Sequence, residues 1–487
     1  MTHCRTLAAL AGALLFVSTG AAAHAAQSAE GPTRLTLADA LRLAHDHSES
    51  VDIARAGEMR ADAAQVRAQS ERLPQLNATA SYSRTLASEF SALESSGPVC
   101  APLTVNASAP LADRLTEIER AATCGALGPS FNLSELPFGQ RNIYQGNLSF
   151  SQSLYTGGRV EAQIEQSNLS RRNASISTMS TEAQVALDVT QAFYDAALSD
   201  RLVAIAESGY EQAVAVFNQT RQSYEAGRQP EFELLRAQVA RDNQQPNVIR
   251  SRASREVAYL RLRQLLELQP DAPLALDVDL DAPDLPLPSP FLPATTVNAS
   301  VDRSIVEQAA IAVSLREAGV KIAKAARLPS VGLASNLSRV GYPSSGAFPG
   351  VGDFRTNWSF SASVQVPVFT GRRLKADERA ALADLSAARA QLKQVRALAA
   401  LDAATAMSQL TAADAAWRAS AGTVDQATRA YSIAELRNRE GLSTQLELTD
   451  ARLSLQVAQA NRAQAARDLQ ITRARAALLP NLPVSLR

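Results

Sequence analysis

Two long segments without proline limit the fold of this 487-residue chain more than any other feature. One runs from Gly139 to Gln229 and the other from Thr370 to Leu479, and both are rich in Ala, Gln, Arg, Glu and Leu, which favour helix. Apolar and small residues recur there in alternating steps of three and four, as in a coiled coil. At about 1.5 Å per residue, either segment would form a helix of roughly 100 Å. Helices of this length do not wrap a compact core, so they predict a rod or a tube.

An internal duplication relates the two segments. LYTGGRV at 154–160 is echoed by VFTGRRL at 368–374, and the same offset of 214 residues separates Gly227 from Gly441. A third echo, RLPQLNATASYS and RLPSVGLASNLS, has an offset of 255. Three ordered echoes indicate two repeats. Each repeat is predicted to contain a helix, a β-hairpin, a long helix and a return helix.

Segments with a period of two lie between the predicted helices. TNWSFSASVQVPVF (356–369) and GNLSFSQSLY (146–155) place apolar residues opposite Ser, Asn and Gln, and 75–85 and 330–340 are weaker partners. This alternation fits a membrane β-strand between lipid and a wet lumen, or else an amphipathic strand of a soluble sheet. Four strands are too few to close a barrel, and open edges are not tolerated in lipid. Several chains would therefore have to share one barrel.

The predicted boundaries follow from these patterns. We expect a signal peptide over 1–25, a first repeat over 26–268, a Pro-rich connector over 269–300, a second repeat over 301–479 and a tail over 480–487. The first repeat should begin with a helix over 36–72, which opens with a capping box, and continue with a hairpin over 73–155, which includes a long external loop over 86–141. A long helix over 157–227 and a return helix over 231–268 should follow, and Pro246 should kink or split the return helix. The second should contain a helix over about 301–327, a hairpin over 328–369, a long helix over 371–440 and a return helix over 443–478.

Composition argues against several classes of function. The 48 basic and 48 acidic residues cancel without long blocks of one sign, which argues against a nucleic-acid-binding role. We find no nucleophile–base–acid set, metal-ligand spacing or phosphate loop, so the chain is predicted not to be an enzyme and to need no cofactor. Cys100 and Cys124 are the only cysteines beyond the leader, and an exported chain would pair them in one disulfide. Two free thiols in the loop are the alternative.

These motifs, in this order, resemble the TolC-like outer-membrane efflux protein family. LTLADALRLAHDHSES resembles the family's first helix, VPVFTGRR its strand-to-helix junction, and YEAGRQPEFELLRAQ its tip turn. The first copy departs from the junction motif, with Ser153-Leu-Tyr where the second has Pro367-Val-Phe, and no lipobox cysteine follows the leader.

The resemblance implies a mixed α/β membrane protein with an internal duplication. Each chain would give four strands to a 12-stranded barrel of a homotrimer in the outer membrane of a Gram-negative bacterium, and long coiled-coil-like helices to a periplasmic tunnel. A periplasmic adaptor (a membrane fusion protein) and an inner-membrane transporter would deliver the cargo to this passive exit duct. Drug efflux, metal efflux and type I protein secretion are all compatible with the sequence. The alternative is a periplasmic coiled-coil scaffold without a pore.

Two sets of glycines have predicted roles. Gly157, Gly158 and Gly371 would permit the sharp change from strand to helix. The turns at Gly227 and Gly441, with neighbouring Gln229 and Ser443, would form the adaptor-docking tip.

The resemblance also implies a pore gate. Glu447 and Asp450 match paired acids that form an aperture ring in the family, and their spacing of three places both on one helix face. The first repeat has Glu233 and Arg236 at the matching offsets. An ordinary solvated helix face is the alternative.

Overall fold

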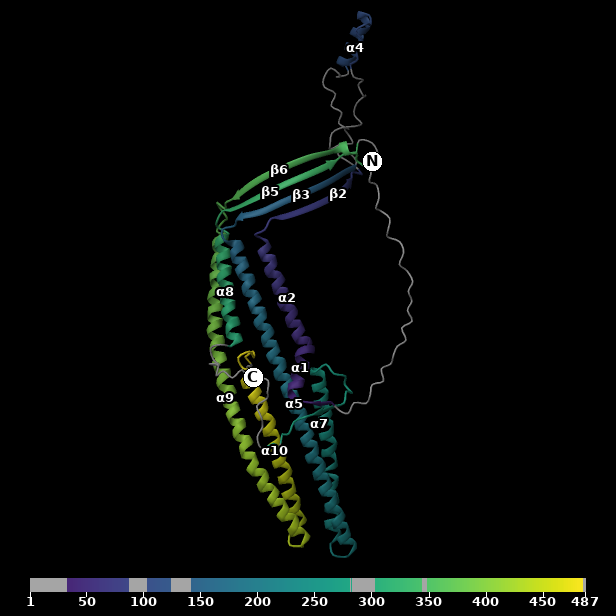
Figure 1. Cartoon of the computed structure of the whole chain (residues 1–487), viewed down its shortest axis with the longest axis vertical. Helices are drawn as coiled ribbons and strands as arrows, with labels where there is room; N and C mark the ends of the chain where they lie inside the picture. Colours follow the sequence, from purple (N-terminus) through teal and green to yellow (C-terminus); the bar gives the residue numbers. More distant parts are fainter. Residues whose placement is uncertain are drawn as a thin grey trace, which may run out of the picture. The chain divides into compact units, whose positions relative to one another are not determined.

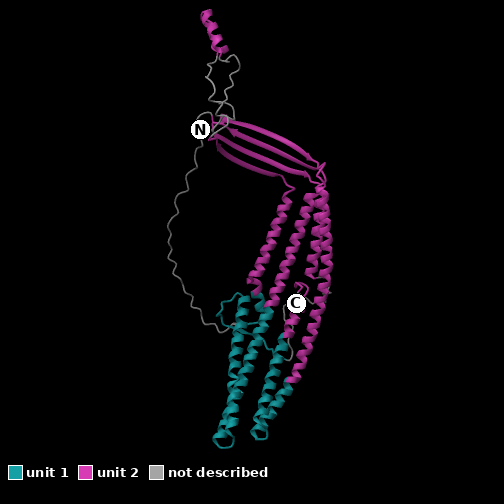
Figure 2. Ribbon diagram, turned by 180° about the vertical axis from the view of Figure 1, so that it is seen from behind, with its two compact units in different colours: residues 1–43, 189–286, 424–467 teal, residues 44–188, 287–423, 468–487 magenta. Residues whose placement is uncertain are grey.

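The structure, a computed structural model, describes residues 33–86, 103–123, 142–280, 282, 303–343 and 348–484. The chain forms two compact units, each built from three parts of the sequence (Figure 2). Unit 1 contains residues 1–43, 189–286 and 424–467, and unit 2 contains residues 44–188, 287–423 and 468–487. Within the described ranges, no helix combines the length and the apolar character needed to cross a membrane.

The helices repeat with the offsets of the sequence echoes. The long helices α5 (Arg159–Glu225) and α9 (Arg373–Arg439) each have 67 residues and are offset by 214. The helices before the hairpins, α2 (Glu49–Ser70) and α8 (Ser304–Ala325), each have 22 residues and are offset by 255. Both long helices start two residues later than predicted, because the residues from which we expected them to start, Gly157 and Gly371, have positive φ angles.

Two predicted helices are each divided in two. The segment 36–72 forms α1 (Leu37–His47) and α2, since Ser48 between them is extended, with φ −64° and ψ 117°. The prediction of one helix there was wrong, although Thr36 caps the start of α1: Asp39 N–H donates to Thr36 Oγ1 at 3.2 Å. The return helix of the first repeat splits at Pro246 into α6 (Glu231–Asp242) and α7 (Gln245–Leu265). The return helix of the second repeat, α10 (Gln445–Leu478), has no proline and is continuous.

Unit 2 contains a four-stranded antiparallel sheet with the order β2-β3-β5-β6 (Figure 1). Its strands are β2 (Gln75–Arg84), β3 (Asn142–Tyr155), β5 (Ser330–Gly341) and β6 (Phe354–Gln365). Ten residue pairs join β2 to β3, and β3 pairs in turn with β5, so the two hairpins form one sheet. β6 is shorter than the predicted 356–369 because Pro367 has no N–H to donate to a ladder.

A pair of short strands and one helix were not predicted. In unit 1, β4 (Leu274–Leu276), from the expected Pro-rich connector, pairs in parallel with β1 (Thr33–Leu35). In unit 2, the segment predicted as an external loop contains α4 (Leu111–Thr123), which Glu117 and Arg120 brace with a 2.6 Å ion pair. A three-residue strand is too short to show an alternation of apolar and polar residues. The helix α4 lies in a segment whose prolines favoured the prediction of a loop.

Polar side chains join neighbouring helices within each unit. In unit 2, Arg172 of α5 contacts Glu307 of α8 at 2.6 Å, and Arg389 of α9 contacts Glu317 of α8 at 2.9 Å. These exposed pairs fix register more than they add stability.

In unit 1, the Asp200 carboxylate of α5 accepts from the Tyr259 hydroxyl of α7 at 2.5 Å. Burial, with this hydrogen bond, raises the pKa of Tyr259 to about 12. Tyr259 therefore stays protonated and keeps its donor role at any physiological pH.

Candidate functional site

The strand register gives the sheet two chemically different faces. Residues paired across neighbouring strands have side chains on the same side. One row runs Leu76, Phe150, Ser335, Phe360, and the next runs Ala78, Leu148, Leu337, Trp358. The rows that alternate with them are polar: Asn77, Ser149, Asn336, Ser359, and Thr79, Asn147, Ser338, Asn357.

The apolar face is open. Trp358 is 76 % exposed and Phe360 is 68 % exposed, whereas large apolar side chains of a soluble sheet would be covered. A contiguous exposed apolar surface of this kind marks a protein or membrane interface.

Both outer edges of the sheet are unpaired. Among the described strands, β2 pairs only with β3, and β6 pairs only with β5. Each edge therefore leaves a row of backbone N–H and C=O groups without ladder partners. The chain has the parts of a barrel wall but not a closed barrel.

The junction glycines have left-handed backbones. The φ angles are +65° at Gly157, +86° at Gly158 and +56° at Gly371. Gly157 is also tightly packed, since a Cβ there would lie 2.7 Å from Leu328 Cβ and 3.0 Å from the Ala325 carbonyl oxygen. Gly371 has no neighbour within 4 Å of that position. The same turn is thus sterically closed in the first repeat and open in the second.

The two tip glycines end their helices in the same way. Gly227 and Gly441 have φ angles of +69° and +71°. The residues that follow them close the Schellman motif: Arg228 N–H donates to the Ser223 carbonyl and Leu442 N–H to the Arg437 carbonyl, both at 2.8 Å.

The residues beside the tip glycines differ in their surroundings. Gln229 is exposed, whereas Ser443 is half-buried and its hydroxyl lies 3.5 Å from the Ala434 carbonyl oxygen. Asn438 Nδ2 also donates to the Ser443 carbonyl at 3.3 Å. Side chains therefore fasten the second tip more firmly than the first.

The predicted gate acids lie in the first two turns of α10. Glu447 and Asp450 are both exposed, and neither forms an ion pair within the described part of the chain. The opposite face of α10 is packed, with Leu448, Arg452 and Leu455 at 4, 5 and 7 % exposure. The structure of the single chain thus leaves both carboxylates free to face other molecules.

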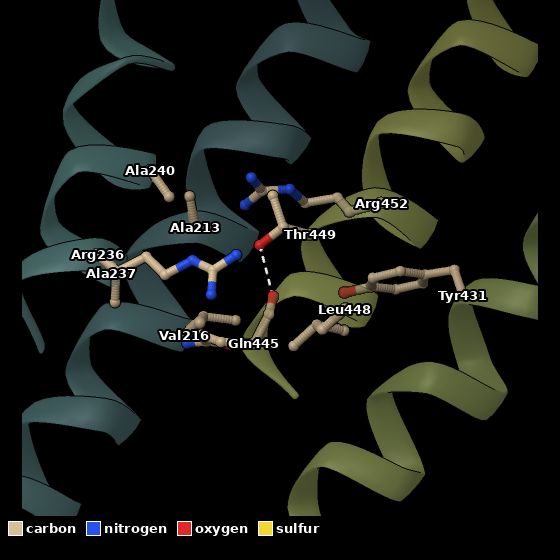
Figure 3. A pocket seen from close by; sticks show the side chains of 10 residues that line it. All are labelled: Ala213, Val216, Arg236, Ala237, Ala240, Tyr431, Gln445, Leu448, Thr449 and Arg452. Carbon is tan, nitrogen blue, oxygen red and sulfur yellow. Dashed lines mark hydrogen bonds between the residues drawn. The ribbon is translucent and has the colours of Figure 1, made fainter. Parts of the chain in front are cut away.

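The sequence reasoning missed a buried arginine on that packed face. Arg452 and Arg236 line a cavity of about 70 Å³ in unit 1 (Figure 3). Burial lowers the pKa of the Arg452 guanidinium, and burial also raises the pKa of the neighbouring Tyr431. The signal was available, since Arg452 occupies the middle of the spacing Leu448, Arg452, Leu455, where an apolar residue belongs.

Other predictions lie outside the described residues. Cys100, Cys124 and the signal peptide all fall in segments that the structure does not describe. The disulfide and the leader remain predictions.

Comparison with known proteins identifies the family. The sequence profile of the outer membrane efflux proteins matches residues 129–267 and 298–482, which is more than half of the chain. The chain belongs to the outer membrane efflux protein family. A search of curated protein sequences finds no match.

Solved structures of outer-membrane channels share the fold of this efflux protein. CusC matches with a TM-score of 0.69 and 16 % identity over 93 % of this chain and 95 % of that chain. The Campylobacter jejuni CmeC outer membrane channel matches with a TM-score of 0.69 and 16 % identity, over 93 % and 87 % of the two chains. The outer membrane protein VceC of Vibrio cholerae matches with a TM-score of 0.68 and 17 % identity, over 91 % and 96 %.

Family membership gives the location and the general role of this efflux protein. It is an outer-membrane protein that acts in efflux, as the motif resemblance implied. The proteins of this family are efflux channels. The two-faced sheet and its free edges are the features of the chain that fit this role.

Proposed function

We propose that three copies of this efflux protein form one 12-stranded barrel, with each copy contributing four strands. The observation that carries the proposal is the sheet itself, which has an exposed apolar face, a polar face and two unpaired edges. Joining β2 of one copy to β6 of the next would satisfy both edges, as a bilayer requires. The apolar face would meet lipid and the polar face would line a wet lumen.

Exposed apolar stripes on the helices of unit 1 support the same assembly. On α6, Phe232, Leu235 and Val239 are 68, 52 and 58 % exposed at helical spacing. Leu446, Leu453 and Val457 form a comparable stripe on α10, at 57, 44 and 58 % exposure. Helices of a neighbouring copy would cover these stripes, as in a coiled coil, and the helices together would build a helical tunnel.

Heating a detergent extract before electrophoresis tests the assembly. An outer-membrane trimer should migrate as a large species when unheated and as a monomer after heating. A chain that fractionates with soluble periplasmic proteins and shows no shift would instead be a scaffold without a pore.

The tips around Gly227 and Gly441 would dock a periplasmic adaptor that links this duct to an inner-membrane transporter. Gln229 offers the cleaner test, because its side chain is exposed, whereas a change at Ser443 also removes the contact with the Ala434 carbonyl. Gln229→Trp should abolish pump-dependent export while the trimer persists, and Gln229→Asn should have little effect. If export survives bulky residues at both Gln229 and Ser443, the tip is not the docking surface.

Glu447 and Asp450 would form the gate of the assembled duct. Three chains would bring six carboxylates to one constriction, where their combined field attracts cations. The absence of ion pairs at either residue within the described chain supports this role.

Single-channel recording tests the gate. Replacing Glu447 and Asp450 together with alanine should weaken cation preference and remove block by multivalent cations added at the periplasmic side. Glu440→Ala, an exposed acid at the second tip, is the matched control and should leave both properties intact. Unchanged selectivity and block in an assembled double variant would reject the gate.

A further inference from the structure

The cavity beside the second tip is positively charged and contains no acidic side chain. Its lining residues come from α5, α6, α9 and α10, all within unit 1. Two of the ten are arginines and the others are uncharged at neutral pH: Ala213, Val216, Ala237, Ala240, Tyr431, Gln445, Leu448 and Thr449. Figure 3 shows the guanidinium groups of Arg236 and Arg452 entering the same space from opposite helices, on either side of the Thr449 hydroxyl.

Arg452 is the unusual member of the pair. It is 5 % exposed, and its Nε is fully buried without a hydrogen-bond partner. Among the described residues, no ion pair or hydrogen bond reaches its guanidinium. An arginine is always charged, and burial of a charge without a partner is costly.

No nearby acidic side chain among the described residues neutralises the charge of Arg452. Glu435 forms a 2.7 Å ion pair with Arg439, and Asp450 lies on the exposed face of α10, so neither lines the cavity. Glu233 precedes Arg236 by one helical turn but is also absent from the lining. The guanidinium groups of Arg236 and Arg452 therefore face the cavity rather than a carboxylate.

We propose that this cavity binds a small oxyanion of the carboxylate or phosphate class, held between Arg236 and Arg452. Guanidinium groups present donors in a planar fork that matches two oxygens of such an anion. The volume of about 70 Å³ is several times the 10–15 Å³ that one water requires, so it has room for a compact anion. The Tyr431 hydroxyl, which points toward the cavity in Figure 3, is an additional donor.

Titration of the purified, assembled full-length protein with inorganic phosphate tests the site, with ionic strength held constant by sodium chloride. Isothermal calorimetry should show saturable binding, and the heat-induced loss of structure should move to higher temperature as phosphate is added. Arg236→Gln and Arg452→Gln should each weaken phosphate binding by at least about tenfold, because each removes charged hydrogen bonds. Acetate should compete with phosphate for the same site.

Two variants provide controls. Arg439→Gln removes an exposed arginine of the same unit, already paired with Glu435, and should bind phosphate as the native chain does. Arg452→Met removes the buried charge but keeps most of the side-chain volume, so it should fold and show no phosphate stabilisation. The proposal is overturned if the native protein shows no saturable binding, or if phosphate stabilises the native chain and Arg452→Met equally.

Discussion

A buried charge cluster in unit 2 leads to a quantitative prediction. Arg303, whose side chain is fully buried, contacts Asp402 of α9 at 2.8 Å. Arg475 of α10 contacts the other oxygen of Asp402 at 3.1 Å and is itself 26 % exposed. Arg303 also donates to the carbonyls of Ala399 and Leu482, at 3.2 and 3.1 Å, and thereby ties the C-terminal segment to α9.

Asp402→Leu should lower the free energy of unfolding by about 3–5 kcal/mol, because it leaves a buried guanidinium without its carboxylate. Combining it with Arg303→Met should recover at least about 2 kcal/mol, since apolar replacement of both partners of a buried ion pair is often neutral or stabilising. The recovery is incomplete because the Leu482 carbonyl loses its donor. Arg475→Gln should cost about 1 kcal/mol or less, as the pair of Arg303 and Asp402 remains.

Urea titration of the detergent-folded protein, followed by helical circular dichroism and by trimer content, measures these differences. The order of stability should be native, Arg475→Gln, the double variant and then Asp402→Leu. The reasoning is refuted if Asp402→Leu is no worse than Arg475→Gln, or if the double variant is less stable than Asp402→Leu.

The junction and the sheet give two further predictions. Gly157→Ala should lower the midpoint temperature of heat dissociation of the trimer more than Gly371→Ala does. Both substitutions place a side chain at positive φ, which costs about 1–2 kcal/mol of stability. Only the new Cβ at Gly157 would also clash with Leu328. Equal losses would contradict the packing at Gly157. Trp358→Arg on the apolar face should impair folding into lipid vesicles by about 2–4 kcal/mol, whereas Asn357→Arg on the polar face should fold normally and alter ion selectivity. The opposite ranking would mean that the faces are assigned the wrong way round.

The repeats and the strands could be predicted from the sequence because their patterns are long and local. Each long helix has 67 residues without proline, and the echoed glycines mark its ends with positive φ angles. Alternation over about ten residues was enough to place all four strands of the sheet. Pro246 likewise predicted the break between α6 and α7.

The remaining features depend on contacts between distant segments. The pairing of β1 with β4 joins residues about 240 positions apart through three residue pairs, which leave no period in the sequence. Arg303 is buried only because Asp402 and the C-terminal carbonyls surround it. The helix spacing marks Arg452 as an inward position, but the cavity that it lines also needs residues of α5, α6 and α9, which lie far from it in the sequence. The break at Ser48 had no proline or glycine to mark it.

Disulfide trapping across the sheet edges tests most directly whether several chains share one barrel. In a chain with Cys100 and Cys124 replaced by serine, one cysteine at Thr79 of β2 is combined in turn with a second at each position of β6 from Asn357 to Ser363. Within one chain β2 and β6 are separated by three strand spacings, about 14 Å, which is too far for a disulfide. Neighbouring chains joined edge to edge would bring at least one combination within reach, and oxidation should then give covalent dimers and trimers and no larger species. A protein that remains monomeric after oxidation in every combination, and whose native mass is that of a single chain, would contradict the shared barrel.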